Sequence, residues 1–340
     1  MNPTAASTGL ARKALVALFA IAVAFALAAC SSNSSSNEEA SGSESASSEQ
    51  QAPESVTIKS LNGNKEEIDL EVPYDAQRIA VLDMASLDIL DDLGLGERVV
   101  GSATTSIDYL QDYVDNADVA NLGTIKEADL EAVAACEPDV IFIGGRLAAS
   151  YDALSEIAPV VFLSTDAEKG LVESVKDNAT TIASMFGLED EVASKMAGFD
   201  DRIAALHEVA EGKTALVTLF TSGSVNVLGN DGRCSIIGNE IGFDNLAADQ
   251  VTSTHGNEVS FETVVAENPD YIFVMNRDAA IGADGADQAK EVVENDLTKN
   301  TTAYADGHIV YLEHPAVWYT AEGGINALDV MLQDLEGALL

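Results

Sequence analysis

The chain has 340 residues and a formal net charge of −40, because 57 Asp and Glu residues outnumber 17 Lys and Arg residues. This charge excludes a nucleic-acid-binding protein, which carries a basic face, and its self-repulsion favours a soluble monomer. With 47% hydrophobic residues the chain can bury an ordinary globular core, so its few basic side chains are informative wherever they gather.

The N-terminal segment has the pattern of an export signal. Two basic residues precede an apolar run that ends in Leu27-Ala28-Ala29-Cys30, and the run is shorter than the roughly 20 residues of a membrane-spanning helix. Residues 1–29 are therefore predicted to be a signal peptide. The last four residues resemble a lipobox, in which Cys30 is lipidated and starts the mature chain; the alternative is a free cysteine in an ordinary signal peptide. Residues 30–55, rich in Ser and Glu, are predicted to be a disordered tether.

Residues 56–166 predict an N-terminal α/β lobe. Asn62-Gly63 marks a hairpin turn near its start. Short apolar runs then alternate with helical segments, which predicts a parallel sheet with helices on both faces. The predicted strands are 78–82, 99–101, 140–143 and 160–163, and the predicted helices are 86–93, 127–135 and 151–157.

Residues 167–212 lack strand signals and predict a helical spine between two lobes. Apolar residues spaced three and four apart form one helical stripe in its second part, and Gly187 separates this stripe from an earlier helical part. The stripe consists of Val192, Met196, Phe199, Ile203 and Leu206.

Residues 213–340 predict a C-terminal lobe of the same kind. A buried strand at 214–220 is followed by a glycine-rich, hairpin-like segment and a short helix that ends at Gly242. The last predicted elements are a strand at 309–312, a loop that holds Trp318-Tyr319, and a helix at 324–339.

One stretch of sequence occurs in both lobes, always 131 residues apart. Each copy reads as a short helix, a Pro-Asp turn, a buried strand and an arginine just past the strand, Arg146 in the first copy and Arg277 in the second. Loops past the carboxyl ends of parallel strands are where open α/β sheets bind ligands. The repeat therefore predicts a cleft that holds an anion between two similar lobes.

Two cysteines remain after Cys30. We interpret Cys136 in the first lobe and Cys234 in the second as small buried hydrophobes, because a bridge between them would lock the lobes together. An exported protein also permits a disulfide, which is the alternative.

Several short motifs, taken with the lipobox, the two lobes and the spine, resemble a known family. That family is the ABC-transporter substrate-binding lipoproteins that carry ferric siderophores, haem and cobalamin, and the motifs are most similar to its catecholate-siderophore branch. The motifs are residues 121–127, Gly145-Arg146, residues 150–152, 253–256 and 268–274, and Trp318-Tyr319. The resemblance implies two Rossmann-like lobes with parallel sheets joined by a long helical spine, of the class III periplasmic-binding-protein type. It also implies a receptor that is not an enzyme and has no intrinsic cofactor.

The resemblance assigns five candidate ligand-binding residues. Arginines at the positions of Arg146, Arg233 and Arg277 contact the catecholate oxygens in this family, and a guanidinium donates paired hydrogen bonds while staying charged. A His and a Tyr at the positions of His255 and Tyr319 complete the shell of ferric iron when the siderophore supplies only four oxygens; phenolate is a hard oxygen donor and imidazole also binds iron. The alternatives are surface ion pairs for the arginines, a capping histidine and a packed aromatic ring.

The same resemblance names partners. The transported ligand is a ferric siderophore, and one surface glutamate in each lobe docks on arginines of the ABC permease; Glu131 and Glu262 are the candidates, with Glu127 as a second choice for the first lobe. The alternative is that these glutamates only offset a helix dipole. The lipid on Cys30 would hold the protein on the outer face of the cytoplasmic membrane.

Two other functions stay open from the residues. A haem or cobalamin receptor of the same fold could use His255 or Tyr319 as an axial haem ligand. A surface α/β hydrolase would need a Gly-x-Ser-x-Gly elbow, and the nearest candidate, Ser222-Gly223-Ser224, lacks that spacing.

Overall fold

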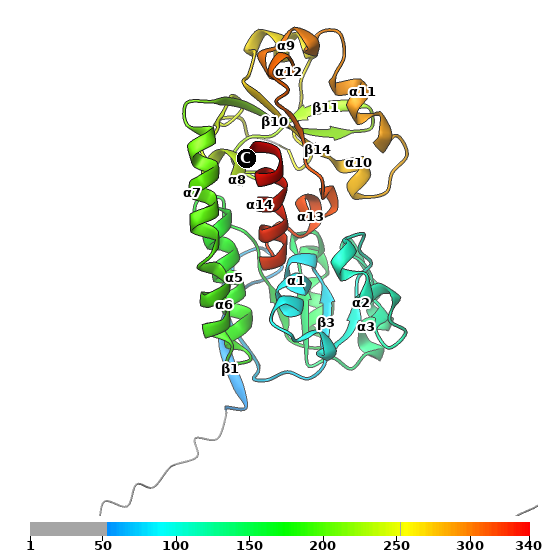
Figure 1. Ribbon diagram of the computed structural model, residues 1–340. Helices are drawn as coiled ribbons and strands as arrows, with labels where there is room; N and C mark the ends of the chain where they lie inside the picture. The colour runs from blue at the N-terminus through cyan, green and yellow to red at the C-terminus, as the bar shows by residue number, and fades with distance from the viewer. Residues whose placement is uncertain (1–52, 252) are drawn as a thin grey trace, which may run out of the picture. The chain divides into compact units, whose positions relative to one another are not determined.

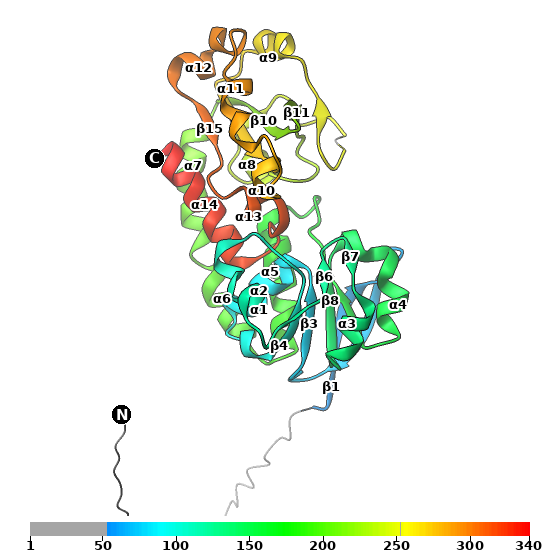
Figure 2. The same cartoon turned by 90° about the vertical axis from the view of Figure 1, so that its right-hand side faces the viewer.

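The computed structural model describes residues 53–251 and 253–340. The predicted signal peptide, Cys30 and most of the predicted tether lie outside these residues. All described residues belong to one compact unit, in which two sheets form two lobes, one above the other in the views of Figure 1 and Figure 2. No helix among the described residues combines the length and the apolar character that crossing a membrane requires.

The N-terminal lobe is built on five parallel strands, and the sequence analysis predicts four of them. Their order is β5 (Ala120–Asn121), β4 (Val99–Ser102), β3 (Ile79–Leu82), β8 (Val140–Ile143) and β9 (Val160–Phe162). Every residue of β3, β8 and β9 is buried, which is typical of parallel strands covered on both faces. The predicted hairpin is the antiparallel pair β1 (Ser55–Leu61) and β2 (Glu67–Pro73).

The C-terminal lobe is built on a mixed sheet. β10 (Thr214–Thr221), β14 (Tyr271–Asn276) and β15 (Ile309–Tyr311) run parallel, and the short β12 (Asp244–Asn245) pairs with β10. β11 (Ser224–Val227) and β13 (Asn257–Glu258) are antiparallel additions at one edge. Ser222 and Gly223 both have positive φ in the two-residue turn between β10 and β11, a geometry that matches the twist of a tight hairpin. The predicted hairpin-like segment is thereby confirmed.

The predicted spine consists of three helices, one more than the two helical parts that the sequence indicates on either side of Gly187. α5 (Leu171–Ser184), α6 (Glu189–Met196) and α7 (Phe199–Ala210) form a column along one side of the molecule (Figure 1). The apolar stripe is buried or half-buried as expected, but the chain turns at Ala197-Gly198, so the stripe belongs to two helices. α14 (Ile325–Leu339) also contributes, because it packs on α5 and α7 and pairs Asp329 and Glu336 with Arg202 of α7.

The repeat predicted from the sequence is confirmed in detail. α3 (Leu130–Ala135) and α9 (Phe261–Glu267) begin in equivalent places, each with a side-chain cap, from Asp129 and Ser260 respectively. The residues after the two helices, Glu137 and Asn268, share a φ of 44°.

Two predicted boundaries are wrong. Residues 127–128 form the short β7 paired with β6 (Gly123–Thr124), so the helix predicted from 127 begins three residues later. Trp318 and Tyr319 lie in a helix, α13 (Pro315–Thr320), and not in a loop. The other helical segments include α1 (Met84–Asp92), α2 (Asp112–Asp115), η3 (Gly145–Ser150), α4 (Tyr151–Ser155), α8 (Ile236–Asn239), α10 (Arg277–Ala280), α11 (Ala289–Val293) and α12 (Thr302–Asp306). Cys136 and Cys234 are buried and free, as predicted.

The start of α14 is capped by a residue of the other lobe. Both carboxylate oxygens of Asp88, in α1, accept backbone N–H bonds of 2.9 Å, from Asn326 and Ala327, and the Tyr109 hydroxyl donates a third bond of 2.5 Å. A Cβ at Gly324 would lie 2.3 Å from Asp88 Oδ1, so only glycine leaves room for the carboxylate. Burial raises the pKa of Asp88 to about 7, although these hydrogen bonds act in the opposite direction.

Replacing Asp88 by alanine is expected to lower the free energy of unfolding by about 2–4 kcal/mol, because two helix-end N–H groups and a hydroxyl lose their acceptor. The pKa of Asp88 is higher in the folded chain than its usual 3.8, so its contribution is largest below about pH 4 and declines as the pH rises towards 7. Urea unfolding of D88A at several pH values checks both points. The exposed D115A, in α2, is the matched control; equal midpoints for the two variants would contradict the prediction.

Candidate functional site

The three predicted arginines gather around one tyrosine ring. Arg146 lies in η3 just past β8, Arg277 begins α10 just past β14, and Arg233 lies in the loop before α8. Their guanidinium carbons lie 5.5, 5.6 and 4.4 Å, respectively, from the centre of the Tyr319 ring. These distances are within the range of cation–π attraction. The structure therefore brings together residues that are up to 173 positions apart in sequence.

Tyr319 is fixed at the centre of this cluster. It is 3% exposed, and its hydroxyl accepts a 3.0 Å hydrogen bond from Arg277 Nε. Burial raises the pKa of Tyr319, but the hydrogen bond from Arg277 and the charges of all three arginines outweigh it, so the pKa lies below its usual value. The phenolate form, which is the form that binds a metal ion, is thus easier to reach than in a free tyrosine.

His255 lies beside Tyr319 in the turn before β13, as predicted. Its Nδ1 is 3.5 Å from the Tyr319 hydroxyl, and the two rings stack with centres 6.4 Å apart. Loss of solvent around the ring lowers the pKa of His255, and the positive charge of the arginines lowers it further. The imidazole is therefore neutral at neutral pH and has a nitrogen lone pair available.

Each arginine of the cluster has one carboxylate close by, and the sequence did not indicate these three carboxylates. Asp278 Oδ1 is 3.6 Å from Arg277, Asp83 attracts Arg146, and Glu322 attracts Arg233. Asp83 and Glu322 are 63 and 89 positions away from their arginines, so no local motif links them. The cluster is consequently less positive than its three guanidinium groups alone would make it.

A pocket of about 170 Å³ opens on the N-terminal side of the cluster. Tyr319, Arg146 and Arg233 of the cluster line it, together with Glu322 and Gly323. The lining also includes the carboxylate of Asp83 and the hydroxyl and amide side chains of Ser86, Ser164, Thr165 and Asn178. The pocket is polar and suits the oxygen atoms of a ligand, but it is smaller than the roughly 300–1,000 Å³ of a typical small-molecule site.

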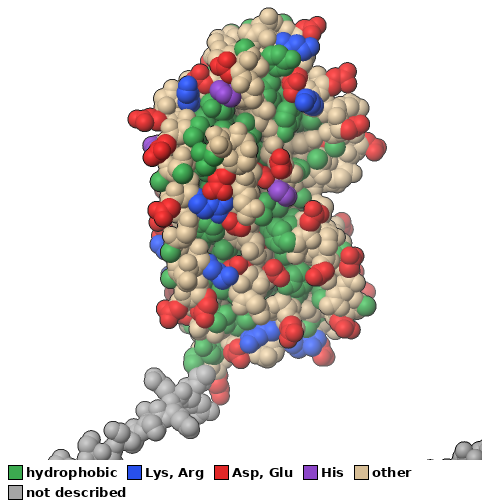
Figure 3. All heavy atoms as spheres, viewed as in Figure 1, with side chains coloured by type: hydrophobic (Ala, Val, Ile, Leu, Met, Phe, Trp, Pro, Cys, Tyr) green, Lys and Arg blue, Asp and Glu red, His purple; other side chains and the backbone are tan. Residues whose placement is uncertain are grey.

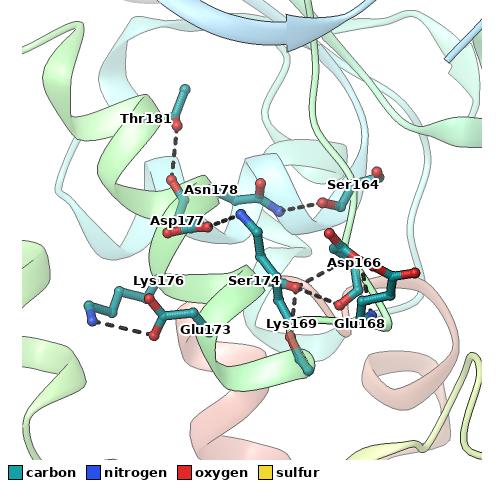
Figure 4. Close-up of polar contacts among 11 residues, drawn as sticks. Ser164, Asp166, Glu168, Lys169, Glu173, Ser174, Lys176, Asp177, Asn178 and Thr181 are labelled. Carbon is teal, nitrogen blue, oxygen red and sulfur yellow. Dashed lines mark hydrogen bonds and ion pairs between the residues drawn. The ribbon is translucent and has the colours of Figure 1, made fainter. Parts of the chain in front are cut away.

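A larger groove of about 960 Å³ adjoins this pocket and shares residues 163–165 and Asn178 with it. Lysines 59, 65, 169 and 176 line it. Lys169 pairs with Asp177 at 2.6 Å and Lys176 with Glu173 at 3.4 Å (Figure 4). Since carboxylates compensate most of these lysines, the charge of the groove gives it no clear preference for an anion.

The sequence profile of the Periplasmic binding protein family matches residues 79–316, which span both sheets and all five predicted ligand-binding residues except Tyr319. The chain belongs to this family. The members of the family that resemble it are substrate-binding proteins.

Three periplasmic binding proteins illustrate the similarity. The petrobactin-binding protein YclQ of Bacillus subtilis is 36% identical over 84% of this chain and 89% of its own length, and its crystal structure has a TM-score of 0.78, covering 84% of this chain and 99% of that one. The iron uptake ABC transporter substrate-binding protein PiuA of Streptococcus pneumoniae is 35% identical with a TM-score of 0.76, over 85% and 100% of the two chains. The periplasmic catecholate-siderophore binding protein VctP of Vibrio cholerae is 28% identical with a TM-score of 0.75, over 83% and 100%.

The two predicted docking glutamates belong neither to the cluster nor to the lining of its pocket. Glu131 and Glu262 are exposed in the first turns of α3 and α9, one in each lobe. Ser222 lies in the tight β10–β11 turn, where its N–H donates to Asp278, and Ser224 begins β11. Acidic side chains are scattered over the face drawn in Figure 3. Among the described residues, no group of three or more His, Cys, Asp or Glu side chains is placed to hold a metal ion.

Proposed function

We propose that this chain is an extracytoplasmic receptor that captures a ferric catecholate-type siderophore and delivers it to an ABC importer. The observation that carries the proposal is the gathering of three arginines around Tyr319, beside His255, in a chain whose net charge is −40. Burial raises the pKa of two of the neighbouring carboxyls, Asp83 and Glu322, so they compensate their arginines only in part. The positive charge that remains suits a negatively charged ligand.

The geometry supports a specific mode of binding. Arg146 is exposed and Arg277 is partly so, and planar guanidinium groups donate paired hydrogen bonds to the neighbouring oxygens of a catecholate. Because the small pocket cannot hold a whole chelate, the ligand would fill the pocket and also cover the outer side of the cluster. An iron atom with an incomplete shell would then take His255 Nδ1 and the Tyr319 phenolate as its last two ligands.

Three further roles complete the proposal. A lipid on Cys30 would anchor the receptor to the outer face of the cytoplasmic membrane. Glu131 and Glu262 would dock on basic residues of the permease, since both are exposed and belong to equivalent positions of the two lobes. The receptor would act as a monomer, with the high negative charge keeping copies apart.

A siderophore is favoured over haem or cobalamin. Two of the three relatives carry names that state iron uptake or a catecholate siderophore, and the three arginines exceed what two haem propionates would use. The binding role is also favoured over a hydrolase, because Ser222 lies in a hairpin turn where its own N–H donates to Asp278.

One titration tests the proposed function. Trp318 is the chain's single tryptophan, is fully buried and precedes Tyr319, so its fluorescence should fall when a coloured ferric complex enters the site. We expect a ferric catecholate to bind the full chain at least about 100-fold more tightly than a ferric hydroxamate or haem, a difference of ~2.7 kcal/mol. Tighter binding of haem, with a sharp Soret band, would instead assign the receptor to haem.

A further inference from the structure

One acidic residue holds the backbone next to Arg233 of the cluster. Glu322, between α13 and α14, accepts a 2.6 Å hydrogen bond from the backbone N–H of Cys234. Cys234 has a φ of 62°, a left-handed conformation that a residue with a side chain adopts only when its surroundings hold it there. The peptide group that Glu322 binds is the one that follows Arg233.

The guanidinium of Arg233 is oriented by hydrogen bonds whose geometry depends on this backbone. Its two terminal nitrogens donate to the carbonyl oxygens of Thr254, at 2.9 Å, and Tyr319, at 3.3 Å. Its Nε–H is buried and has no acceptor among the described residues. The two backbone carbonyls and the aromatic ring that hold this guanidinium are not anions, so none of them compensates its positive charge.

We propose that Glu322 is a positioning residue of the arginine site. It fixes the backbone that orients Arg233, and its charge sets how strongly Arg233 attracts an anionic ligand. This inference rests on the proposed function. Glu322 has the right place for both roles, since it contacts the backbone after Arg233 and also lines the pocket beside the arginine.

The charged groups around Glu322 are few and give its protonation a defined effect. Arg233 attracts it and Glu240, which follows α8, repels it, while Arg146 and Asp83 line the same pocket. Burial raises the pKa of Glu322 to about 7, against the attraction of Arg233 and the hydrogen bond from Cys234. Below pH 7 the carboxyl is neutral and Arg233 is uncompensated; above pH 7 the carboxylate opposes the entry of an anion. By linkage, an entering anion favours the protonated form, so binding takes up a proton.

Two variants of Glu322 separate the two roles. Gln keeps an oxygen that accepts from Cys234 and imitates the neutral carboxyl, whereas Ala removes both the acceptor and the charge. The probe is a hexadentate ferric tris-catecholate whose absorption spectrum is unchanged between pH 6 and pH 8. Affinity for the full-length wild type is expected to fall by about 3- to 10-fold over this interval.

E322Q should show no such fall and should bind more tightly than the wild type at pH 8, while E322A should bind more weakly than the wild type at both pH values. The exposed E313Q carries the same chemical change outside the pocket and should follow the wild type. Circular dichroism confirms the fold of each variant. If E322Q keeps the wild-type pH dependence, or weakens binding at pH 8, the inference is wrong while the proposed function stands.

Calorimetry of the wild type in buffers of different ionisation enthalpy gives a second test. Binding at pH 7 without proton uptake overturns the inference, and absence of binding overturns both proposals.

Discussion

Replacing Arg277 by glutamine is expected to weaken the binding of ferric catecholates by about 100-fold, or ~2.7 kcal/mol, whether the siderophore supplies four or six oxygens. Arg277 is largely buried, with 17% of its side chain exposed, and it donates hydrogen bonds of 3.0 Å to both Tyr319 and Thr221. Its loss removes a charge from the site and also frees the Tyr319 hydroxyl. It leaves the buried Asp278 without its arginine as well, which makes the local field more negative.

The comparison needs two companion variants. R277K keeps the charge but not the planar pair of donors, so we expect an intermediate loss of about 10-fold. R98Q removes an arginine that pairs with Asp75 at 2.6 Å and belongs to no part of the cluster, and its affinity should match the wild type. Fluorescence titration of Trp318 measures all three. Unchanged affinity in R277Q, with the fold intact, would remove Arg277 from the binding site.

The double variant H255A/Y319F is expected to distinguish siderophores by the number of oxygens that they give to iron. A tetradentate ferric complex needs two further ligands, and His255 and Tyr319 lie side by side with Nδ1 and the hydroxyl 3.5 Å apart. Loss of both should weaken this complex by at least about 100-fold, because even partners that only orient a metal ligand are worth 10- to 100-fold. A hexadentate complex has a full iron shell and should lose no more than about threefold, the share of one hydrogen bond.

The absorption spectrum provides an independent readout of the same prediction. Binding of the tetradentate complex to the wild type should shift its visible charge-transfer band, because phenolate and imidazole join the iron shell, and the double variant should show no shift. The single variants H255A and Y319F assign the shift to one ligand. If the tetradentate and hexadentate complexes weaken equally, His255 and Tyr319 contact the ligand without binding iron.

The main architecture follows from local patterns in the sequence. The alternation of apolar runs with helical segments indicates the parallel strands, and the repeat places Arg146 and Arg277 at equivalent strand ends because its offset is constant. Arg233 has no counterpart in the repeat and comes only from the family resemblance. Pro315 stands at the first position of α13, and proline there is a regular helix-start signal that indicates a helix over Tyr319.

Other features could not be predicted from one sequence because they depend on distant contacts. Glu322 and Cys234 are 88 positions apart, and the hydrogen bond between them forms only when α13 docks beside the arginine loop. The break at Ala197-Gly198 interrupts an apolar stripe that continues without a change of period, so the periodicity alone gives no sign of it. The mixed character of the second sheet likewise depends on where the hairpin strand β11 docks.

The cap on α14 has a consequence for the order in which the chain can fold. Asp88 lies early in the sequence, yet the two backbone groups that it binds belong to the last described helix. During synthesis or passage through a membrane, the N-terminal sheet would form while this carboxyl still lacks its partners, with a site open where α14 will pack on α1. The first half of the protein therefore stays incomplete until the final helix emerges, which delays stable folding until nearly all of the described chain is available.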